Sequence, residues 1–396
     1  MAADGAASTT PDRWLSVGTS TAEDSRLAGL SAAEQALAGR PAQLLVVFCT
    51  AQHDPAAVLA GINAISGGAP LIGCSSSAVI AADGPTRRGV IVTAFGGPGF
   101  TVGTAGATGA ASQQRKVGAA VARCALDVGE HPHQVLILLT DGLAHDQEEI
   151  LSGAYDVVGA SMPLVGGTAS PDPAVRRTFQ FHNDRVLTDS VVGATIGSDA
   201  PLGVGLRHGW RKVGEPMIVT RSLNGQVFTL DDQPALETYL GRLGAPAEAY
   251  SDPVAFDQFA RTRPIGVRRR SGEEVRNVSS VEHLREGWLR SGGEIPEGGL
   301  IWLMEGDEAS VLDAASGACH AAVEALHGAE PIGFLAFDCV SRSDLLGEVG
   351  MRMEVERLAG EAAGTPLAGF YTWGEIARTR GINGFHNQTL VVLAVS

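Results

Sequence analysis

The chain has 396 residues, of which 44% are hydrophobic and 18% are charged, as is typical of a folded globular protein. This length exceeds what one hydrophobic core usually supports, so we expect two lobes. The net charge of −15 argues against nucleic acid and against an anionic membrane surface as partners, because both normally bind a basic surface.

The first predicted structure is a β-α-β unit that follows a loose N-terminal region. Residues 1–40 are expected to contain a tail, a first strand and a first helix. The continuous apolar run at 44–49 is typical of a strand buried on both faces. Asp54-Pro55 predicts the start of a helix, because Asp is a good N-cap and Pro fits the first helical position. A second strand at 70–74 completes the unit, and this spacing implies that the two strands are parallel.

The same unit recurs roughly 90 residues later. A strand at 135–139 and a helix at 146–158 match the first strand and its helix. Pro-Leu-Val-Gly-Gly-Thr at 163–168 matches Pro-Leu-Ile-Gly-Cys-Ser at 70–75. This period is far too long for a solenoid repeat, so we interpret the pattern as a duplicated half of a domain.

Two β-hairpins are predicted after the second unit. The segment 178–187 turns at His182-Asn183-Asp184, between two short strand-like runs. The segment 217–230 turns at Asn224-Gly225, which is the preferred sequence of a type I′ turn. The second hairpin has the stronger signal of the two.

The pattern changes at about residue 231, where two short helices are predicted at 233–243 and 253–260. An arginine-rich segment follows, with Arg261, Arg263, Arg268, Arg269, Arg270 and Arg276. A phosphate or other anion site would explain these arginines, and so would a solvated strand pair. We favour the strand pair, because Glu273 and Glu274 are interleaved with the arginines and no aromatic residues accompany them.

The last hundred residues return to a plain alternation of strands and helices. Strands are predicted at 300–304, 331–337, 366–371 and 389–395, and helices at 307–326 and 345–362. Such alternation predicts an α/β lobe whose ligand crevice lies at the carboxyl ends of the strands. The predicted fold is therefore α/β, with duplicated β-α-β units in mixed sheets flanked by helices and arranged in two lobes.

The cysteines and the N-terminus bear on the cellular compartment. The five cysteines are scattered and include no CxxC pair, so they suggest neither a disulfide framework nor a zinc site. The first dozen residues contain no apolar segment of the signal-peptide type. Glycine and proline interrupt both long uncharged stretches. We therefore expect a cytoplasmic protein without a membrane span.

Three polar clusters follow predicted strands in the last part of the chain: 338–342, 371–375 and 386–388. If neighbouring strands align, all three clusters would line one crevice. The candidate ligand-binding residues are Cys339, Arg342, Tyr371, Gly374, Glu375, His386 and Asn387. Cys339 lies at the start of a helix with Arg342 nearby, and both features would lower the pKa of its thiol.

The segments that carry these clusters resemble a known family. The sequences PIGFLAFDCVSRSDLLG at 331–347, PLAGFYTWGEIAR at 366–378 and HNQTLVV at 386–392 are similar to the C-terminal domain of the FIST family. The sequences LLVVFCT, PLIGCSSS and VGLRHGW, which begin at Leu44, Pro70 and Val204, are more loosely similar to the N-terminal FIST domain. The resemblance implies a FIST N-terminal domain at 41–230 and a FIST C-terminal domain at 231–396.

The resemblance also implies a function. FIST domains act in intracellular signal transduction as sensory domains for small ligands, with amino acids or their relatives as the proposed class, and some members are described as haem-binding gas sensors. The sequence shows no kinase, cyclase or other output signature. A signal would therefore pass through a separate protein partner.

Our leading hypothesis is a stand-alone sensor of an amino-acid-like ligand, without a cofactor or metal. Arg342 would hold the ligand carboxylate in a bidentate fork, and Glu375 would hold its ammonium group. Cys339, Tyr371 and Asn387 would line the pocket.

Two alternatives remain. The second hypothesis is a sensor that binds haem without covalent attachment, with His182, His208 or His386 as the axial ligand. The third is an enzyme in which Cys339, paired with His386, acts as an activated nucleophile.

Overall fold

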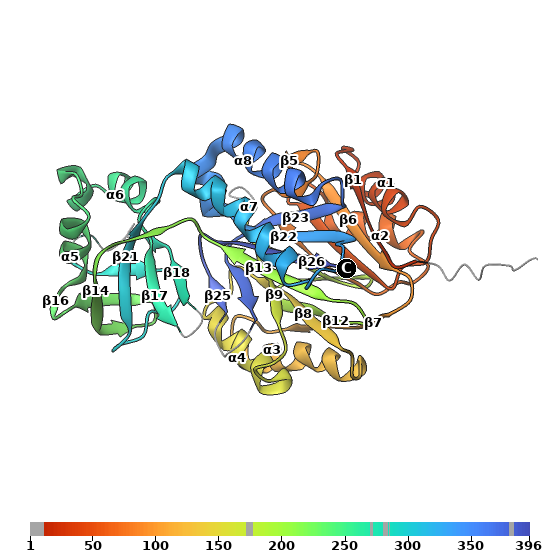
Figure 1. Cartoon of the computed structure of the whole chain (residues 1–396), viewed down its shortest axis with the longest axis horizontal. Helices are drawn as coiled ribbons and strands as arrows, with labels where there is room; N and C mark the ends of the chain where they lie inside the picture. The colour runs from red at the N-terminus through yellow and green to blue at the C-terminus, as the bar shows by residue number, and fades with distance from the viewer. Residues whose placement is uncertain (1–11, 172–176, 270–271, 280–283, 285, 380–383) are drawn as a thin grey trace, which may run out of the picture.

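The computed structural model describes residues 12–171, 177–269, 272–279, 284, 286–379 and 384–396. Three mixed six-stranded sheets and their helices form the larger part of the protein, which we call the α/β body (12–207 and 306–396). An eight-stranded sheet forms a smaller part, the insert lobe (211–305), which lies beside the body at the left of Figure 1. The expectation of an α/β fold in two lobes is confirmed.

The three sheets of the α/β body have the same internal arrangement. Sheet 1 has the order β1 (Trp14–Ser20), β6 (Val90–Gly96), β2 (Leu44–Thr50), β3 (Leu71–Ser76), β10 (Gln180–His182), β11 (Arg185–Leu187). Sheet 2 has the order β7 (Phe100–Thr108), β12 (Ser190–Ser198), β8 (His133–Asp141), β9 (Leu164–Ala169), β24 (Glu375–Arg378), β25 (Phe385–His386). Sheet 3 has the order β13 (Leu202–Arg207), β26 (Leu390–Val395), β22 (Gly333–Cys339), β23 (Leu367–Thr372), β4 (Val79–Ala81), β5 (Gly84–Thr86).

Each sheet is built around one parallel strand pair from a β-α-β unit. The pairs β2–β3 and β8–β9 confirm the two predicted units, and β22–β23 is a third copy. Each unit sends its following hairpin to another sheet, so β4–β5 joins sheet 3, β10–β11 joins sheet 1 and β24–β25 joins sheet 2. The predicted duplication is therefore a triplication. Its third copy escaped notice because the insert lobe breaks the period of roughly 90 residues at which the first two copies recur.

Helices cover the outer face of every sheet. Sheet 1 carries α1 (Ser25–Leu37) and α2 (Pro55–Asn63), and Asp54 caps α2 as predicted. Sheet 2 carries α3 (Gln114–Ala122), the short helix η1 (Arg123–Asp127) and α4 (Gln147–Val158). Sheet 3 carries α7 (Glu308–Glu324) and α8 (Val340–Ala362), which is interrupted at Gly347 with φ 63°. None of the helices in the described ranges is long and apolar enough to cross a membrane.

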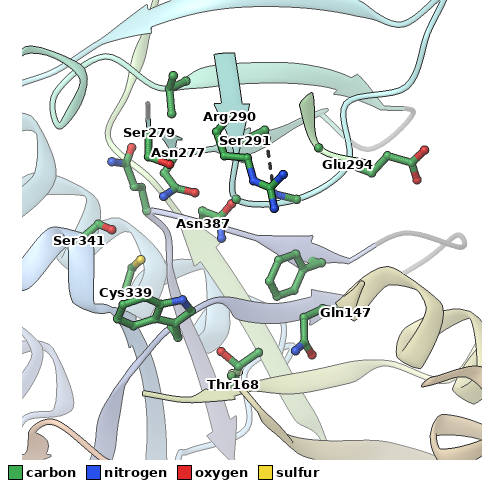
Figure 2. A pocket seen from close by; sticks show the side chains of 18 of the residues that line it. Gln147, Thr168, Asn277, Ser279, Arg290, Ser291, Glu294, Cys339, Ser341 and Asn387 are labelled. Atoms are coloured by element: carbon green, nitrogen blue, oxygen red, sulfur yellow. Dashed lines mark hydrogen bonds between the residues drawn. The ribbon is translucent and has the colours of Figure 1, made fainter. Parts of the chain in front are cut away.

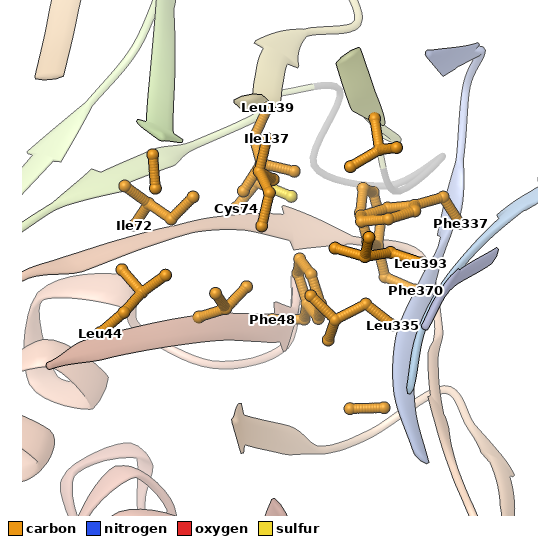
Figure 3. Close-up of a cluster of buried hydrophobic side chains, with 14 of the residues drawn as sticks. Leu44, Phe48, Ile72, Cys74, Ile137, Leu139, Leu335, Phe337, Phe370 and Leu393 are labelled. Carbon is orange, nitrogen blue, oxygen red and sulfur yellow. The ribbon is translucent and has the colours of Figure 1, made fainter. Parts of the chain in front are cut away.

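The inner faces of the three sheets share one hydrophobic core. In β2, Leu44, Val46 and Phe48 point into this core, while the alternate residues pack under α1 and α2. This alternation explains why the strand is apolar throughout. Phe48 of sheet 1 and Phe370 of sheet 3 stack with ring centroids 4.5 Å apart, and Phe337 contacts Phe370 edge-on at 5.9 Å (Figure 3).

The insert lobe has its own core and contains the second predicted hairpin. Its strands are β14 (Arg211–Leu223), β15 (Gln226–Leu230), β16 (Gln233–Pro234), β17 (Ile265–Arg269), β18 (Gly272–Arg276), β19 (Val278–Ser279), β20 (Leu289–Ser291) and β21 (Leu300–Glu305). Its helices are α5 (Ala235–Arg242), η2 (Ala247–Tyr250) and α6 (Pro253–Ala260). Asn224 and Gly225 have positive φ values of 52° and 74°, as a type I′ turn requires. The strand pair predicted for the arginine-rich segment is present as β17–β18. The expectation that it is solvated is wrong at its end, because Arg276 is fully buried. Arg270 lies outside the described residues.

The insert lobe spans the boundary expected near residue 231 between the two domains. The chain enters the insert lobe along β14 and leaves it along β21, and these two strands pair with Arg211 opposite Glu305. From α7 onward the chain lies in the α/β body again. Residues 1–11 of the expected N-terminal region lie outside the described residues, and β1 and α1 belong to the body.

Candidate functional site

A cavity of about 1130 Å³ lies where the insert lobe meets the α/β body. The body contributes the loop between β8 and α4, the end of β9, the start of α8 and the turn before β26. The insert lobe contributes the β14–β15 turn, part of α6, and the segments around β19 and β20. This space is large enough for a small organic ligand, and sites of this kind often lie between two lobes. In Figure 2, Asn277, Ser279, Arg290 and Ser291 lie on the insert-lobe side, Gln147, Thr168 and Cys339 on the body side, and Asn387 between them.

Buried contacts fix the position of the insert lobe beside the cavity. The guanidinium of Arg276 is fully buried and donates a hydrogen bond to the Phe385 carbonyl oxygen at 2.7 Å. It also pairs with Glu148 of the body and Glu274 of the lobe, both at 3.2 Å. The backbone N–H of Asn387 donates to the Val275 carbonyl oxygen. These contacts hold the walls of the cavity in a defined geometry.

Four buried oxygen atoms of the cavity-lining residues have no hydrogen-bond partner within the described part of the chain. They are Asn277 Oδ1, Asn387 Oδ1, Gln388 Oε1 and Thr168 Oγ1. Buried polar atoms are nearly always paired, and leaving one unpaired costs about 1–3 kcal/mol. Four such atoms in the wall of one cavity are therefore the feature expected of a preformed site for a polar ligand.

The structure brings two of the seven predicted site residues to this cavity. Cys339 and Asn387 are part of its wall, together with their neighbours Ser341 and Gln388. The other five do not line it: Arg342, Tyr371, Gly374, Glu375 and His386. Arg342, Tyr371, Glu375 and His386 are buried in the α/β body. The expectation that the three strand exits meet holds for the backbone, but most of the side chains point away from the cavity.

Arg342 is bound within the protein on all sides. Its Nε donates to Asp338 at 2.8 Å, one Nη donates to Glu354, and the carbonyl oxygens of His208 and Val311 accept further bonds. All three side chains of the Asp338–Arg342–Glu354 cluster are fully buried. Burial and the nearby carboxyl of Glu354 raise the pKa of Asp338. This guanidinium therefore joins β22 to α8 and is not presented to a ligand in the cavity.

Glu375 is also committed to internal contacts. It accepts hydrogen bonds from the Thr372 hydroxyl and from the Thr389 backbone N–H, the latter at 3.1 Å. Burial raises the pKa of Glu375 to about 8, so its carboxyl is mostly neutral at pH 7. A neutral buried carboxyl does not provide the charge expected for holding a ligand ammonium group.

Replacing Glu375 with Gln is expected to flatten the pH dependence of stability. The folded chain retains the Glu375 proton up to a pKa of about 8, whereas an unfolded Glu releases it near about 4.3. The stability of the wild-type protein should therefore fall between these pH values as pH rises, by at most about 1.4 kcal/mol per pH unit. Urea unfolding of wild type and variant from pH 5 to pH 8 measures the difference in slope. Equal slopes would mean that Glu375 is already ionised in the folded chain.

The thiol of Cys339 does not have the lowered pKa that was expected from its position. Burial, and then the nearby Glu375, raise the pKa of Cys339 well above its usual value, although the backbone N–H groups of Ser341 and Gln388 act in the opposite direction. The expected lowering of this pKa is therefore wrong, because desolvation outweighs the helix N-terminus. The enzyme hypothesis paired this thiol with His386. Within the described residues, His386 Nε2 instead lies 3.1 Å from the Ala377 carbonyl oxygen, and the thiol is hydrogen-bonded to Glu375.

Comparison with family models assigns both halves of the chain. The model of the FIST N domain matches residues 43–233, and the model of the FIST C domain matches residues 235–378. The chain belongs to the FIST family. FIST domains are associated with sensory and signal-transduction proteins.

Similar proteins extend over different lengths of this FIST chain. It is 29% identical to the uncharacterized protein Rv0628c of Mycobacterium tuberculosis, across 95% of this chain and 97% of the relative. It is 27% identical to the uncharacterized protein MJ1623 of Methanocaldococcus jannaschii, across 41% of this chain and 32% of the relative. A solved structure, T. maritima PurL complexed with ATP, aligns with 97% of this chain and 72% of that chain at 11% identity and a TM-score of 0.21. This score is too low to support an argument about fold or function.

The three histidines expected as axial haem ligands do not reach the cavity of this FIST protein. His386 Nε2 is bound to a backbone carbonyl, and His208 Nδ1 accepts the Trp210 backbone N–H at 2.9 Å. His182 Nε2 lies 3.3 Å from the Thr104 hydroxyl. None of the three is among the cavity-lining residues, which are a mixture of polar and apolar groups. Haem binding needs an axial donor aimed into an apolar slot, so these histidines offer no such site.

The sequence interpretation missed Thr168 and Asn277, and it included Gln388 in the 386–388 cluster without choosing it as a candidate. Thr168 lies in the repeated Pro-Leu-x-Gly segment and Gln388 is next to Asn387, so both could have been found. Asn277 follows the arginine-rich segment, and nothing in its neighbourhood indicates that the insert lobe folds over the strand exits of the body.

Proposed function

We propose that this FIST protein is a cytoplasmic sensor. It binds a small, polar, amino-acid-like ligand in the cavity between the α/β body and the insert lobe, and it signals through a separate protein. The observation that carries this proposal is the group of four buried, partnerless oxygens in the cavity wall. A ligand that paired with them would recover free energy that the protein alone does not recover.

The two sides of the cavity suggest how binding becomes a signal. Asn277 belongs to the insert lobe, whereas Thr168, Asn387 and Gln388 belong to the body. A ligand that contacts both sides favours the arrangement in which they face each other, and so shifts the population of lobe orientations. The paired strands β14 and β21 are the covalent connection along which such a change would pass.

The chemistry of the wall supports an amino-acid-like ligand. Arg261 and Arg290 line the cavity and supply guanidinium groups suited to a carboxylate. The amide oxygens of Asn387 and Gln388 accept hydrogen bonds from an amine. In this assignment the two cavity arginines replace Arg342, and the amides replace Glu375.

The separate partner and the cytoplasmic location rest on simpler observations. Leu143 and Trp373 expose apolar surface beside the cavity, with 47% and 52% of their area accessible. Ligand binding would alter the surroundings of these side chains, which makes them suitable contacts for a partner that reads the signal. The five cysteines are all buried thiols, which suits a reducing compartment.

A thermal-shift screen against amino acids and related metabolites tests the proposal. A ligand at a hundredfold over its Kd should add about 2.7 kcal/mol to the free energy of unfolding. Because each kcal/mol raises Tm by roughly 2–4 °C in a domain of this size, the expected shift is several degrees. Gly292→Ala should abolish the shift, because its Cβ would lie 1.7 Å from Asn277 Oδ1 and 2.8 Å from Asn387 Oδ1.

Gly360→Ala is the matched control for this variant. Gly360 lies in α8, and its added Cβ would meet no atom within 4 Å. This variant should retain the full ligand-induced shift. The proposal fails if no compound in the panel shifts Tm, or if Gly292→Ala responds as the wild type does.

A further inference from the structure

We infer that the ligand of the inter-lobe cavity carries a cationic side chain, with a protonated amine or a guanidinium group in addition to any α-amine, and that the oxygens of Asn277, Asn387 and Gln388 hold this group. The inference rests on the proposed function and defines the chemical class that the site selects. Three observations support it: the orientation of the amides, the charge of the wall and its aromatic side chains.

The three amide oxygens are buried acceptors that belong to residues of the cavity wall. Gln388 Nε2 donates to the Arg261 carbonyl oxygen at 3.0 Å, which fixes the orientation of this amide and leaves Oε1 without a partner. Asn277 Oδ1 and Asn387 Oδ1 approach Gly292 from the two lobes and are both buried and partnerless. Three carbonyl-type oxygens accept hydrogen bonds and cannot donate them, so the matching group is rich in N–H donors.

The charged groups around these oxygens favour a cation. The acidic residues that line the cavity are Asp146, Glu148, Asp257, Glu294 and Asp344, and the arginines are Arg261 and Arg290. Of the five carboxylates, Glu148 is paired with the buried Arg276, and Asp257 also has an interaction within the protein. Carboxylates thus outnumber arginines in the described wall, and their field lowers the energy of a positive group between them.

The aromatic side chains of the wall also favour a positively charged ligand group. Trp373 lines the cavity with 52% of its surface exposed, and Phe385 lines it close to Asn387. Phe385 already faces one cation, because the Arg276 guanidinium lies 5.9 Å from its ring centroid. An indole ring beside carbonyl oxygens is a favourable surface for an ammonium or guanidinium ion.

An anionic group fits these surroundings poorly. It would meet oxygens at the amide end of the cavity, and only Arg261 and Arg290 could offset the repulsion. Arg261 donates one Nη to the Asp344 carbonyl oxygen at 3.4 Å and so already has a contact within the protein. The arginines therefore suit a second, anionic end of the ligand rather than the group held by the amides.

Calorimetric titration of the full chain with four probes tests the inference. The probes are L-arginine, agmatine, which is its decarboxylated form, L-citrulline, which replaces the guanidinium with a neutral ureido group, and L-glutamate. The two cations should bind at least tenfold more tightly than citrulline and glutamate. Citrulline or glutamate binding as tightly as arginine would overturn the inference, and so would a lack of binding by both cations. In either case the proposed function still stands if another compound of the amino-acid panel binds and Gly292→Ala abolishes that binding.

Variants at Asn277 provide a second, independent test with agmatine. Asn277→Asp adds a negative charge to the site and should tighten agmatine binding several-fold, whereas Asn277→Leu removes the acceptor at similar volume and should weaken it about tenfold. Asn277 is only half-buried and its Oδ1 has no partner, so both variants should fold, which thermal unfolding checks. Equal effects of the two substitutions, or weaker binding by Asn277→Asp, would contradict the assignment of a cation to this position.

Discussion

Replacing Arg342 with Ala is expected to lower the free energy of unfolding by about 3–5 kcal/mol, which is typical of breaking a buried ion pair. The substitution leaves Asp338 and Glu354 fully buried without their shared cation. Each of these carboxyls already has one oxygen without a hydrogen-bond partner among the described residues, so no second partner there compensates for the loss of the guanidinium. Urea unfolding of the purified variant measures the loss.

Arg357→Ala is the matched control for this prediction. Arg357 pairs with Asp313 on the surface, where the two side chains are 37% and 74% exposed. Removing an exposed pair should change stability by less than about 1 kcal/mol. If Arg342→Ala instead unfolds like the wild type and loses only ligand binding, then the arginine contacts the ligand, as the sequence alone had suggested.

Replacing Phe370 with Ala is expected to cost about 3–5 kcal/mol, which is typical of a large aromatic side chain in a fully packed core. Phe370 lies where sheets 1 and 3 meet and contacts both Phe48 and Phe337. The three sheets enclose this core completely, so the cavity left by the ring cannot be filled by solvent or by a surface side chain.

The loss at Phe370 should appear in the cooperative unfolding of the whole α/β body. Leu126→Ala, at a position 70% exposed, is the control and should change stability by less than about 1 kcal/mol. A similar small effect at Phe370 would mean that sheets 1 and 3 are not packed together through these rings.

Local patterns in the sequence predicted most of the secondary structure. The apolar run of β2, the Asp54 cap of α2 and the Asn224-Gly225 turn each depend on neighbouring residues alone, and all three are present in the structure. The two β-α-β units could be aligned because few residues separate their parts. The third was not aligned, because the insert lobe breaks the repeat period and because α8 has 23 residues where α2 has 9 and α4 has 12. Pro366-Leu367-Ala368-Gly369, at the start of β23, nevertheless repeats the Pro-Leu-x-Gly signal.

The candidate site was only partly predictable, because side-chain direction and distant partners decide it. Cys339 and Asn387 reach the cavity, as their positions at strand ends suggested. Arg342 was predicted to bind a ligand because a lone arginine at a strand exit looks available. Its partner Glu354 lies twelve residues further on, beyond the break in α8 at Gly347. The insert-lobe side of the cavity depends on a tertiary contact that no local pattern contains.

The central claim is that the ligand lies between the insert lobe and the α/β body, and a structure of the protein with the best ligand of the panel tests it most directly. The account predicts that the ligand occupies the inter-lobe cavity, with N–H donors within about 3.2 Å of Asn277 Oδ1, Asn387 Oδ1 or Gln388 Oε1. A ligand bound elsewhere, with these oxygens still unpaired, would contradict it.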